Sequence, residues 1–156
     1  FYENKNKYAF SFQMLAYITR LNLINEIIEK NPNAIIISER SVYTDCNVFA
    51  QMLYNQRLID EAEFQIYKLW FNSFEKNLNK HRFIFLNTNC QECLNRIKKR
   101  NRTGEKEITE EYVEACEYYH IEWLKKYDSQ IVCALDDGLF IEDKVKLMYD
   151  YISSFI

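Results

Sequence analysis

Three short apolar runs, separated by much longer helical segments, constrain the fold of this chain most. Residues 34–37, 83–86 and 131–135 are short and apolar, and none of them alternates with polar residues. Such a run is typical of a strand that is covered on both faces, as in a parallel sheet. Because helical segments lie between the runs, the sequence predicts an α/β fold with a parallel sheet.

The intervening segments carry helical periodicity or helix-capping residues. Helices are predicted at 10–28, 41–56, 60–79, after Asn89, from Thr109 and over 141–155. Asp60 with Glu63 forms a capping-box pattern, and Asn89 can cap the helix that follows it. The first helix is expected to bury one stripe and to end near residues 31–32; this stripe comprises Phe10, Met14, Leu15, Ile18, Leu21, Ile24, Ile27 and Ile28.

Length and composition narrow the class of protein. A chain of 156 residues suits one domain spanning 1–156, and only 2 glycines and 1 proline disfavour disorder or an all-β fold. No apolar stretch approaches the roughly 20 residues that span a bilayer. A net charge of −3 argues against a general nucleic-acid binder. We therefore expect neither a membrane nor a nucleic acid as partner.

The cysteines indicate a reducing compartment. Their number is odd, at 5, and no secretory leader is visible, so free thiols are expected in a cytoplasmic protein. Cys90 and Cys93 form a C-x-x-C pair, but a zinc site needs a second ligand pair at supporting spacing. Neither histidine has that spacing, so the sequence predicts no metal there.

Candidate chemistry follows the predicted strands, since ligands of open α/β sheets bind beyond the carboxyl ends of the strands. Glu39 and Arg40 come directly after the run 34–37. A carboxylate and a guanidinium at this place can hold a magnesium ion and an oxyanion. Taken alone, the dipeptide fits a surface ion pair better.

A cluster of arginines lies further along the chain. Arg96 and Arg100 are four residues apart and share a helical face, and Arg102 follows in a polar segment. A lid over about 98–107 that closes on a polyphosphate fits this pattern, because arginine offers forked, permanently charged donors. A solvated basic helix end fits it too. From the residues alone, a nucleotide kinase and a phosphate-binding module stay equally open.

Four motifs in order resemble the deoxynucleoside kinases, especially the deoxycytidine and deoxyguanosine kinases. The segment 39–50 reads Glu-Arg-Ser-Val-Tyr-Thr-Asp-Cys-Asn-Val-Phe-Ala, which is similar to the ERS segment of that family. Residues 10–13, Phe-Ser-Phe-Gln, resemble its F-x-F-Q, and Arg20 follows seven residues later. Residues 93–102 resemble its C-x-x-R-I-x-x-R-x-R lid, and 111–124 the helix after it. The turn before the lid departs from the family, with Cys and Gln at 90–91 in place of Pro and Glu.

The resemblance implies a three-layer parallel sheet of the P-loop kinase type. The sequence holds no G-x-x-x-x-G-K-[ST]. We therefore expect the chain to be truncated at its N-terminus, with the phosphate loop, the first strand and the glutamate that acts as general base lying upstream. We also expect these 156 residues by themselves neither to fold stably nor to catalyse.

The resemblance also implies roles in binding a nucleoside. Tyr2 and Glu105 would contact the 3′-hydroxyl of the sugar. Gln13 would hydrogen-bond the edge of the base, since an amide offers both donors and acceptors, and Phe49 would stack on it. Without the resemblance, Tyr2 and Phe49 would be interpreted as core residues and Glu105 as an ordinary solvated carboxylate.

Arg20 and Asp45 would form a pair at the base end of the pocket. Thymidine-preferring relatives lack this pair, so the resemblance favours deoxycytidine or a deoxypurine over thymidine. The same set argues against a thymidylate-kinase-like enzyme, which needs additional basic residues for a substrate phosphate.

Further residues would serve the phosphate donor, ATP or another nucleoside triphosphate. Arg40 would steady the 5′-oxygen and the transferred phosphoryl group, and Glu39 would help to hold Mg²⁺. Phe140 lies where the family packs a loop against the adenine of the donor. The residues that would clamp the donor phosphates are Arg96, Arg100 and Arg102.

The implied function is therefore phosphorylation of a deoxynucleoside at its 5′-hydroxyl. A non-catalytic relative that binds nucleosides or regulates a partner is the alternative. Helices 10–28 and 41–56 carry apolar faces, and helices near these positions build a homodimer in the family. A mitochondrial location stays open beside the cytoplasmic one, because the N-terminus is expected to be missing.

Overall fold

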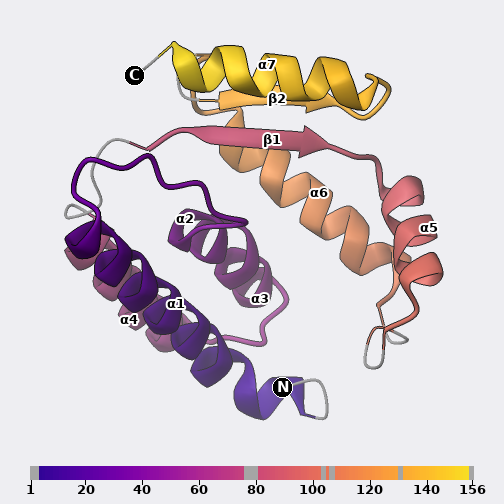
Figure 1. Ribbon diagram of the computed structural model, residues 1–156. Coiled ribbons are helices and arrows are strands. Elements are labelled where there is room, and N and C mark those ends of the chain that lie inside the picture. The colour runs from indigo at the N-terminus through magenta and orange to yellow at the C-terminus, as the bar shows by residue number, and fades with distance from the viewer. Residues whose placement is uncertain (1–3, 76–80, 103–104, 106–107, 130–131, 155–156) are drawn as a thin grey trace. The chain divides into compact units, whose positions relative to one another are not determined.

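The computed structural model describes residues 4–75, 81–102, 105, 108–129 and 132–154 (Figure 1). Its contacts divide the chain into two units, Phe1–Leu78 and Asn79–Ile156. Each unit has buried side chains of its own. A single domain over the whole chain stays a prediction.

The regular secondary structure in the described part of the first unit is helical. The helices predicted at 10–28, 41–56 and 60–79 are present, the middle one as three consecutive pieces that include a π-helix. Positions 76–79 of the last helix lie outside the described residues. Their bounds are α1, Lys5–Lys30; α2, Val42–Thr44; the π-helix η1, Asp45–Ala50; α3, Gln51–Asn55; and α4, Glu61–Glu75. Both α1 and α4 pack against η1 and against each other.

The predicted stripe of α1 is confirmed at Leu21, and most of its other members are half-buried. The buried residues of α1 are Ala9, Gln13, Tyr17 and Leu21, at intervals of four. The predicted core residue Leu15 is 66% exposed, and Ile18 is also exposed. The aromatic packing explains the difference. The ring of Tyr17 lies 5.5 Å from Tyr67 and 6.2 Å from Phe71 on α4, and these contacts select the face of α1 that turns inward.

The strand predicted at 34–37 does not form. These residues have no regular secondary structure, and Ile35 and Ile37 are 50% and 70% exposed. A strand is stable only where a neighbour pairs with its N–H and C=O groups. Among the described residues of this unit no strand runs beside 34–37, so β-branched composition alone does not make it one.

The second unit contains the parallel sheet, and the strands predicted near 83–86 and 131–135 are confirmed. Strand β1 pairs in parallel with β2, with Phe83 opposite Val132 and Asn87 opposite Asp136. The elements are β1, Phe83–Asn87; α5, Cys90–Arg100; α6, Glu110–Leu124; β2, Val132–Asp136; and α7, Ile141–Ser153. The α/β class with a parallel sheet is therefore confirmed, with two strands in the described chain.

The two strands are less covered than their composition predicts. Helix α7 runs along β2 and α6 crosses β1 (Figure 1). The ring of Phe83 on β1 lies 4.8 Å from Trp123 on α6, whereas Leu86 is 58% exposed. Leu135 is the buried residue of β2. A sheet of two strands offers its helices little surface, so part of each strand remains open.

Local capping signals are confirmed. The Asp60 N–H donates to Glu63 Oε2 at 3.0 Å and the Glu63 N–H donates to Asp60 Oδ1 at 2.8 Å, a reciprocal capping box. Asn89 accepts from the Glu92 N–H at 2.9 Å and starts α5. Thr109 caps α6. None of the described helices is both long and apolar enough to cross a membrane.

Candidate functional site

A part-buried ion pair joins α1 to η1 in the first unit. Arg20 Nε on α1 donates to Asp45 Oδ2 at 2.8 Å, and the two side chains are 32% and 4% exposed. Burial raises the pKa of the Asp45 carboxyl, and Arg20 and Arg40 oppose this rise. The charged form of the Asp45 carboxylate thus depends on its arginine partner for stabilisation.

Gln13 belongs to the same group. Its side chain is buried, and Nε2 donates to the backbone carbonyl of Asp45 at 3.0 Å. Tyr67 on α4 adjoins this amide. Its hydroxyl is buried and meets no hydrogen-bond partner within the described residues. Burial raises the pKa of Tyr67 well above its usual range, and the Cys46 thiol adds to the rise.

The Glu39–Arg40 junction lies close to this group. Arg20 Nη1 donates to the Glu39 carbonyl at 3.4 Å, and the Arg40 guanidinium stands 5.0 Å from the centroid of the half-buried Phe49 ring. Arg40 has φ of 62°, the left-handed region that is uncommon outside glycine. The unit therefore gathers Gln13, Arg20 and Asp45 with Arg40 and Phe49, while their roles in binding stay predictions. Tyr2 lies outside the described residues.

The predicted phosphate-binding arginines of the second unit are held by carboxylates. Arg96 Nε donates to Glu92 Oε1 at 2.8 Å, and its Nη2 donates to both oxygens of Asp137 at 3.1 Å. Arg100 makes a two-point pair with Glu105, at 3.1 Å and 2.6 Å. Arg102 is exposed. Acidic side chains of the same unit thus occupy positions on Arg96 and Arg100 that phosphate oxygens can take.

A shallow depression of about 460 Å³ opens where both strands end. Four carboxylates line it, so a phosphate group inside it would be repelled. Phe140 starts α7 and is 77% exposed. The lining residues are Asn87, Asn89, Glu92, Glu117, Asp136, Asp137 and Gly138. The carboxyl ends of strands, where the sequence predicts chemistry, thus carry a polar recess.

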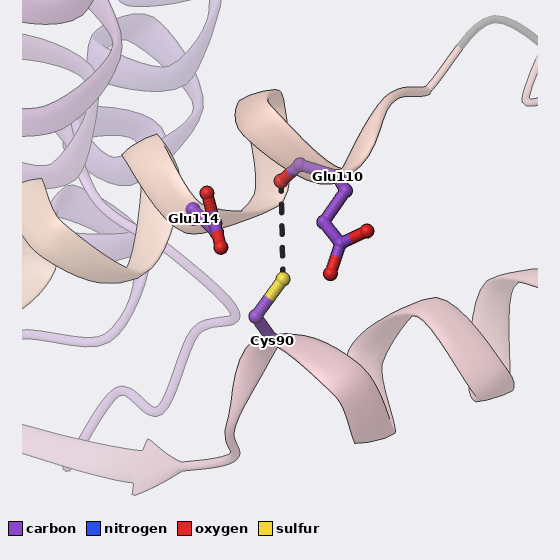
Figure 2. A group of neighbouring side chains, drawn as sticks. All are labelled: Cys90, Glu110 and Glu114. Atoms are coloured by element: carbon purple, nitrogen blue, oxygen red, sulfur yellow. Dashed lines mark hydrogen bonds between the residues drawn. The ribbon is translucent and has the colours of Figure 1, made fainter.

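One group of side chains has donor atoms suited to a metal ion. Cys90 Sγ on α5 and carboxylate oxygens of Glu110 and Glu114 on α6 lie within 4.8 Å of one another (Figure 2). The thiol donates to the Glu110 carbonyl at 3.8 Å. Desolvation and these glutamates raise the pKa of Cys90, so the thiol keeps its proton at neutral pH. Cys93 is not in the group, and instead donates to the Thr88 carbonyl at 3.6 Å.

Sequence reasoning missed several of these contacts. The partners of Arg96 include Asp137, which lies 41 residues further along the chain. The sequence Asp-Asp-Gly at 136–138 was the available signal for this contact, because it places a carboxylate at the end of β2. Lys68 donates to the buried Cys46 thiol at 3.6 Å. No spacing rule links these last two residues.

The sequence model of the family described as "Deoxynucleoside kinase" matches residues 1–156. Deoxycytidine kinase 2 of Gallus gallus is 31% identical over 175 aligned residues, which cover 99% of this chain and 66% of that protein. Deoxycytidine kinase of Bos taurus is 34% identical over 131 residues, covering 79% of this chain and 50% of that protein. The chain thus spans between half and two thirds of the length of these relatives.

Solved structures agree on the fold. A structure of deoxyadenosine kinase from M. mycoides with bound dCTP has a TM-score of 0.79 at 24% identity, and covers 98% of this chain and 77% of its own. A second, with the products dCMP and dCDP, has a TM-score of 0.76 at 25% identity, and covers 98% of this chain and 78% of its own. Because the family model matches the chain from its first residue to its last, this protein belongs to the deoxynucleoside kinase family.

Proposed function

We propose that the protein, in its full-length form, transfers the γ-phosphoryl group of ATP or another nucleoside triphosphate to the 5′-hydroxyl of a deoxynucleoside. Membership of the family supports the reaction class. The observation that carries the proposal is the group of the buried Gln13 and Asp45 with the part-exposed Arg20 in the first unit. It combines an amide, a guanidinium and a carboxylate, and such groups read the edge of a nucleobase.

Asp45 favours deoxycytidine or a deoxypurine over thymidine. A carboxylate is only an acceptor, and Arg20 Nε occupies Oδ2. An exocyclic amino group, as on cytosine or adenine, can donate to such an acceptor. Thymine presents a carbonyl oxygen at the equivalent place, and two acceptors repel each other. Phe49, with Arg40 on its ring, supplies an aromatic face for stacking, and Tyr2 and Glu105 are proposed to bind the 3′-hydroxyl.

Charge stabilisation accounts for most of the proposed catalysis. In the transfer the bond between the γ-phosphorus and the bridging oxygen breaks, the bond to the 5′-oxygen forms, and the hydroxyl proton leaves to a base. Arg40 is proposed to steady the 5′-oxygen and the phosphoryl group. The donor phosphates are assigned to Arg96, Arg100 and Arg102, and the donor base to Phe140.

Glu39 is proposed to help hold Mg²⁺. The Glu39 side chain is exposed, and it offers one carboxylate. Mg²⁺ in phosphoryl-transfer sites takes one or two carboxylates and completes its shell with phosphate oxygens and water. Glu39 therefore fits such an ion together with the donor, whose charge the ion would neutralise.

The test is a phosphorylation assay of the full-length protein with ATP and four deoxynucleosides. We expect deoxycytidine or deoxyadenosine to exceed thymidine in kcat/KM. Asp45→Asn is expected to lower kcat/KM for the preferred substrate by about 10–100-fold, because the site loses a paired acceptor. Asp150→Asn, an exposed carboxylate on α7, is the matched control.

Three results would contradict the proposal. A preference for thymidine would remove the role of Asp45. Phosphorylation of thymidine monophosphate instead would support a thymidylate-kinase-like enzyme. Binding of nucleosides without phosphorylation of any would support the non-catalytic alternative.

We also propose that the protein forms a homodimer through α1 and α4. The segment 41–56 is not suited to an interface, because most of it is buried inside its own unit. In contrast, Leu15 on α1 and Leu69 on α4 are each 66% exposed, and Trp70 is 45% exposed. Light scattering at graded concentrations should show a dimer that Leu15→Lys with Leu69→Lys converts to a monomer.

We propose that the protein is located in a reducing compartment, and the cytoplasm is the first choice. All five cysteines are free, so none of them needs an oxidising environment. Localisation of the tagged full-length protein tests this, and a mitochondrial signal would replace the cytoplasmic assignment.

A further inference from the structure

Asp137, to which the sequence assigns no role, contacts two positively charged side chains, Arg96 and Lys144. It lies in the turn after β2, which the Gly138 N–H shapes by donating to Asp136 Oδ1 at 2.8 Å. Its carboxylate accepts from Arg96 Nη2 on α5 through both oxygens, at 3.1 Å each. Lys144 Nζ on α7 donates to Asp137 Oδ1 at 3.2 Å and to its carbonyl at 3.0 Å. One side chain thus joins α5, the turn and α7.

The charges of Asp137 and Arg96 persist at neutral pH. Lys144 and Arg96 hold the pKa of Asp137 below its usual range, while Glu92 and Asp137 raise that of Arg96. Asp137 and Lys144 have side chains only 20% and 19% exposed. Isolated surface ion pairs contribute little, whereas a network of several charges with shared hydrogen bonds fixes its members.

The network fixes one side of the Arg96 guanidinium and leaves another open. Nε is bound by Glu92 and Nη2 by Asp137. The third nitrogen, Nη1, has no hydrogen bond to the described part of the chain. The Arg96 side chain is 57% exposed. Its orientation is therefore set while one edge stays available to an anion.

The same turn leads to Phe140, three residues after Asp137 and exposed at the start of α7. Under the proposed function Arg96 binds donor phosphate and Phe140 packs on the donor base. The side chain of Asp137 binds Arg96, and the backbone of the same turn connects Asp137 to Phe140. A nucleoside triphosphate has a fixed range of distances between base and phosphates, so such a link favours one arrangement of both ligands.

We propose that Asp137 is a positioning residue for the phosphate donor, acting through Arg96. This inference rests on the proposed function. Without Asp137 the long Arg96 side chain must be ordered when the donor binds, which weakens binding. The expected consequence is an increase of about three- to tenfold in the KM for the donor, with the KM for the nucleoside unchanged.

The direction of this change separates positioning from simple charge. Asp137 is an anion beside an expected polyphosphate, so removing its charge would strengthen donor binding if charge were its only effect. Positioning predicts weaker binding instead. Asp137→Asn keeps the size of the side chain and removes the charge, so the sign of the change in donor KM decides between them.

The experiment measures KM for ATP and for the preferred deoxynucleoside in the full-length protein. The variants are Asp137→Asn, Arg96→Met and the double variant, with Asp143→Asn, an exposed carboxylate in the first turn of α7, as control. We expect Asp137→Asn to raise the KM for ATP in the wild-type background and to have no effect in the Arg96→Met background. The control should leave both KM values unchanged.

Each other outcome overturns the inference. A lower KM for ATP would show that Asp137 only competes with the donor. An equal rise in the Arg96→Met background would show that it acts elsewhere, and a rise in both KM values would show a general structural role. Should Asp137→Asn not fold, Asp137→Glu keeps the charge, displaces it by one methylene, and must raise the KM for ATP alone. A wild-type protein that neither binds ATP nor phosphorylates nucleosides would instead refute the proposed function.

Discussion

Arg20 Nε donates to Asp45 Oδ2 at 2.8 Å, and the carboxylate is almost completely buried while the arginine reaches the surface. Removing the arginine leaves the carboxylate without its ionic partner. We expect Arg20→Met to lower the free energy of unfolding by about 1–3 kcal/mol, measured by urea denaturation. Lys30→Met, which removes an exposed partner of Glu26 on the same helix, should change it by less than about 0.5 kcal/mol. Equal losses of stability in the two variants would mean that the Arg20–Asp45 pair stabilises the fold no more than an exposed pair does.

The raised pKa of Asp45 makes stability depend on pH. An acid whose pKa is higher in the folded than in the unfolded state binds more protons when folded, so its contribution falls as pH rises between the two values. The window begins near the ordinary aspartate pKa of about 4. Relative to Asp45→Asn, the wild-type protein should lose stability as pH rises through this window. Urea denaturation of both proteins at several pH values measures the difference, and a constant difference would contradict the assignment.

Two of the buried tyrosines, Tyr17 and Tyr67, should respond oppositely to loss of their hydroxyls. Tyr67 Oη lacks a hydrogen-bond partner within the described residues, whereas Tyr17 Oη donates to the Trp70 carbonyl at 3.5 Å. An unpaired buried hydroxyl is costly. Tyr67→Phe should therefore leave stability unchanged or raise it by up to about 1 kcal/mol, and Tyr17→Phe should lower it by about 0.5–1 kcal/mol. Thermal melts of both variants test this, and a clear loss for Tyr67→Phe would reveal a partner of its hydroxyl.

Two substitutions of Arg40 distinguish the effect of backbone strain on stability from the loss of its side chain in catalysis. Its φ of 62° suits glycine, and a side chain there is strained. Arg40→Gly should be more stable than Arg40→Ala by about 1 kcal/mol, since only glycine relieves the strain. Under the proposed function both variants should lose about 10²–10³-fold in kcat, because a phosphoryl-stabilising donor is gone. Retained activity in either variant would remove Arg40 from the proposed site.

The features predicted correctly depend on residues close in the chain. The capping box of Asp60 and Glu63 and the Asn89 cap form between neighbours, so the local sequence specifies them. The strands near 83–86 and 131–135 also follow from their own composition, and pair because each has the other beside it.

The failures involve partners far apart in the chain. The run 34–37 has strand composition, yet hydrogen bonding requires a neighbour that local sequence does not provide. On α1 the predicted stripe is wrong at Leu15 and Ile18, because Tyr17 packs against rings some 50 residues away and these contacts turn the neighbouring face inward.

The sequence by itself determined the α/β class, most helices and, through its motifs, the family and the residues expected to bind nucleoside and donor. The motifs also predicted that Arg20 pairs with Asp45, and the structure confirms this contact. The tertiary structure alone decided that Arg100 meets Glu105 and that Arg96 meets Asp137. The physical reason is that periodicity and capping act over a few residues. A salt bridge instead depends on how distant elements pack, and only packing sets the distances and burial that give each charge its effect.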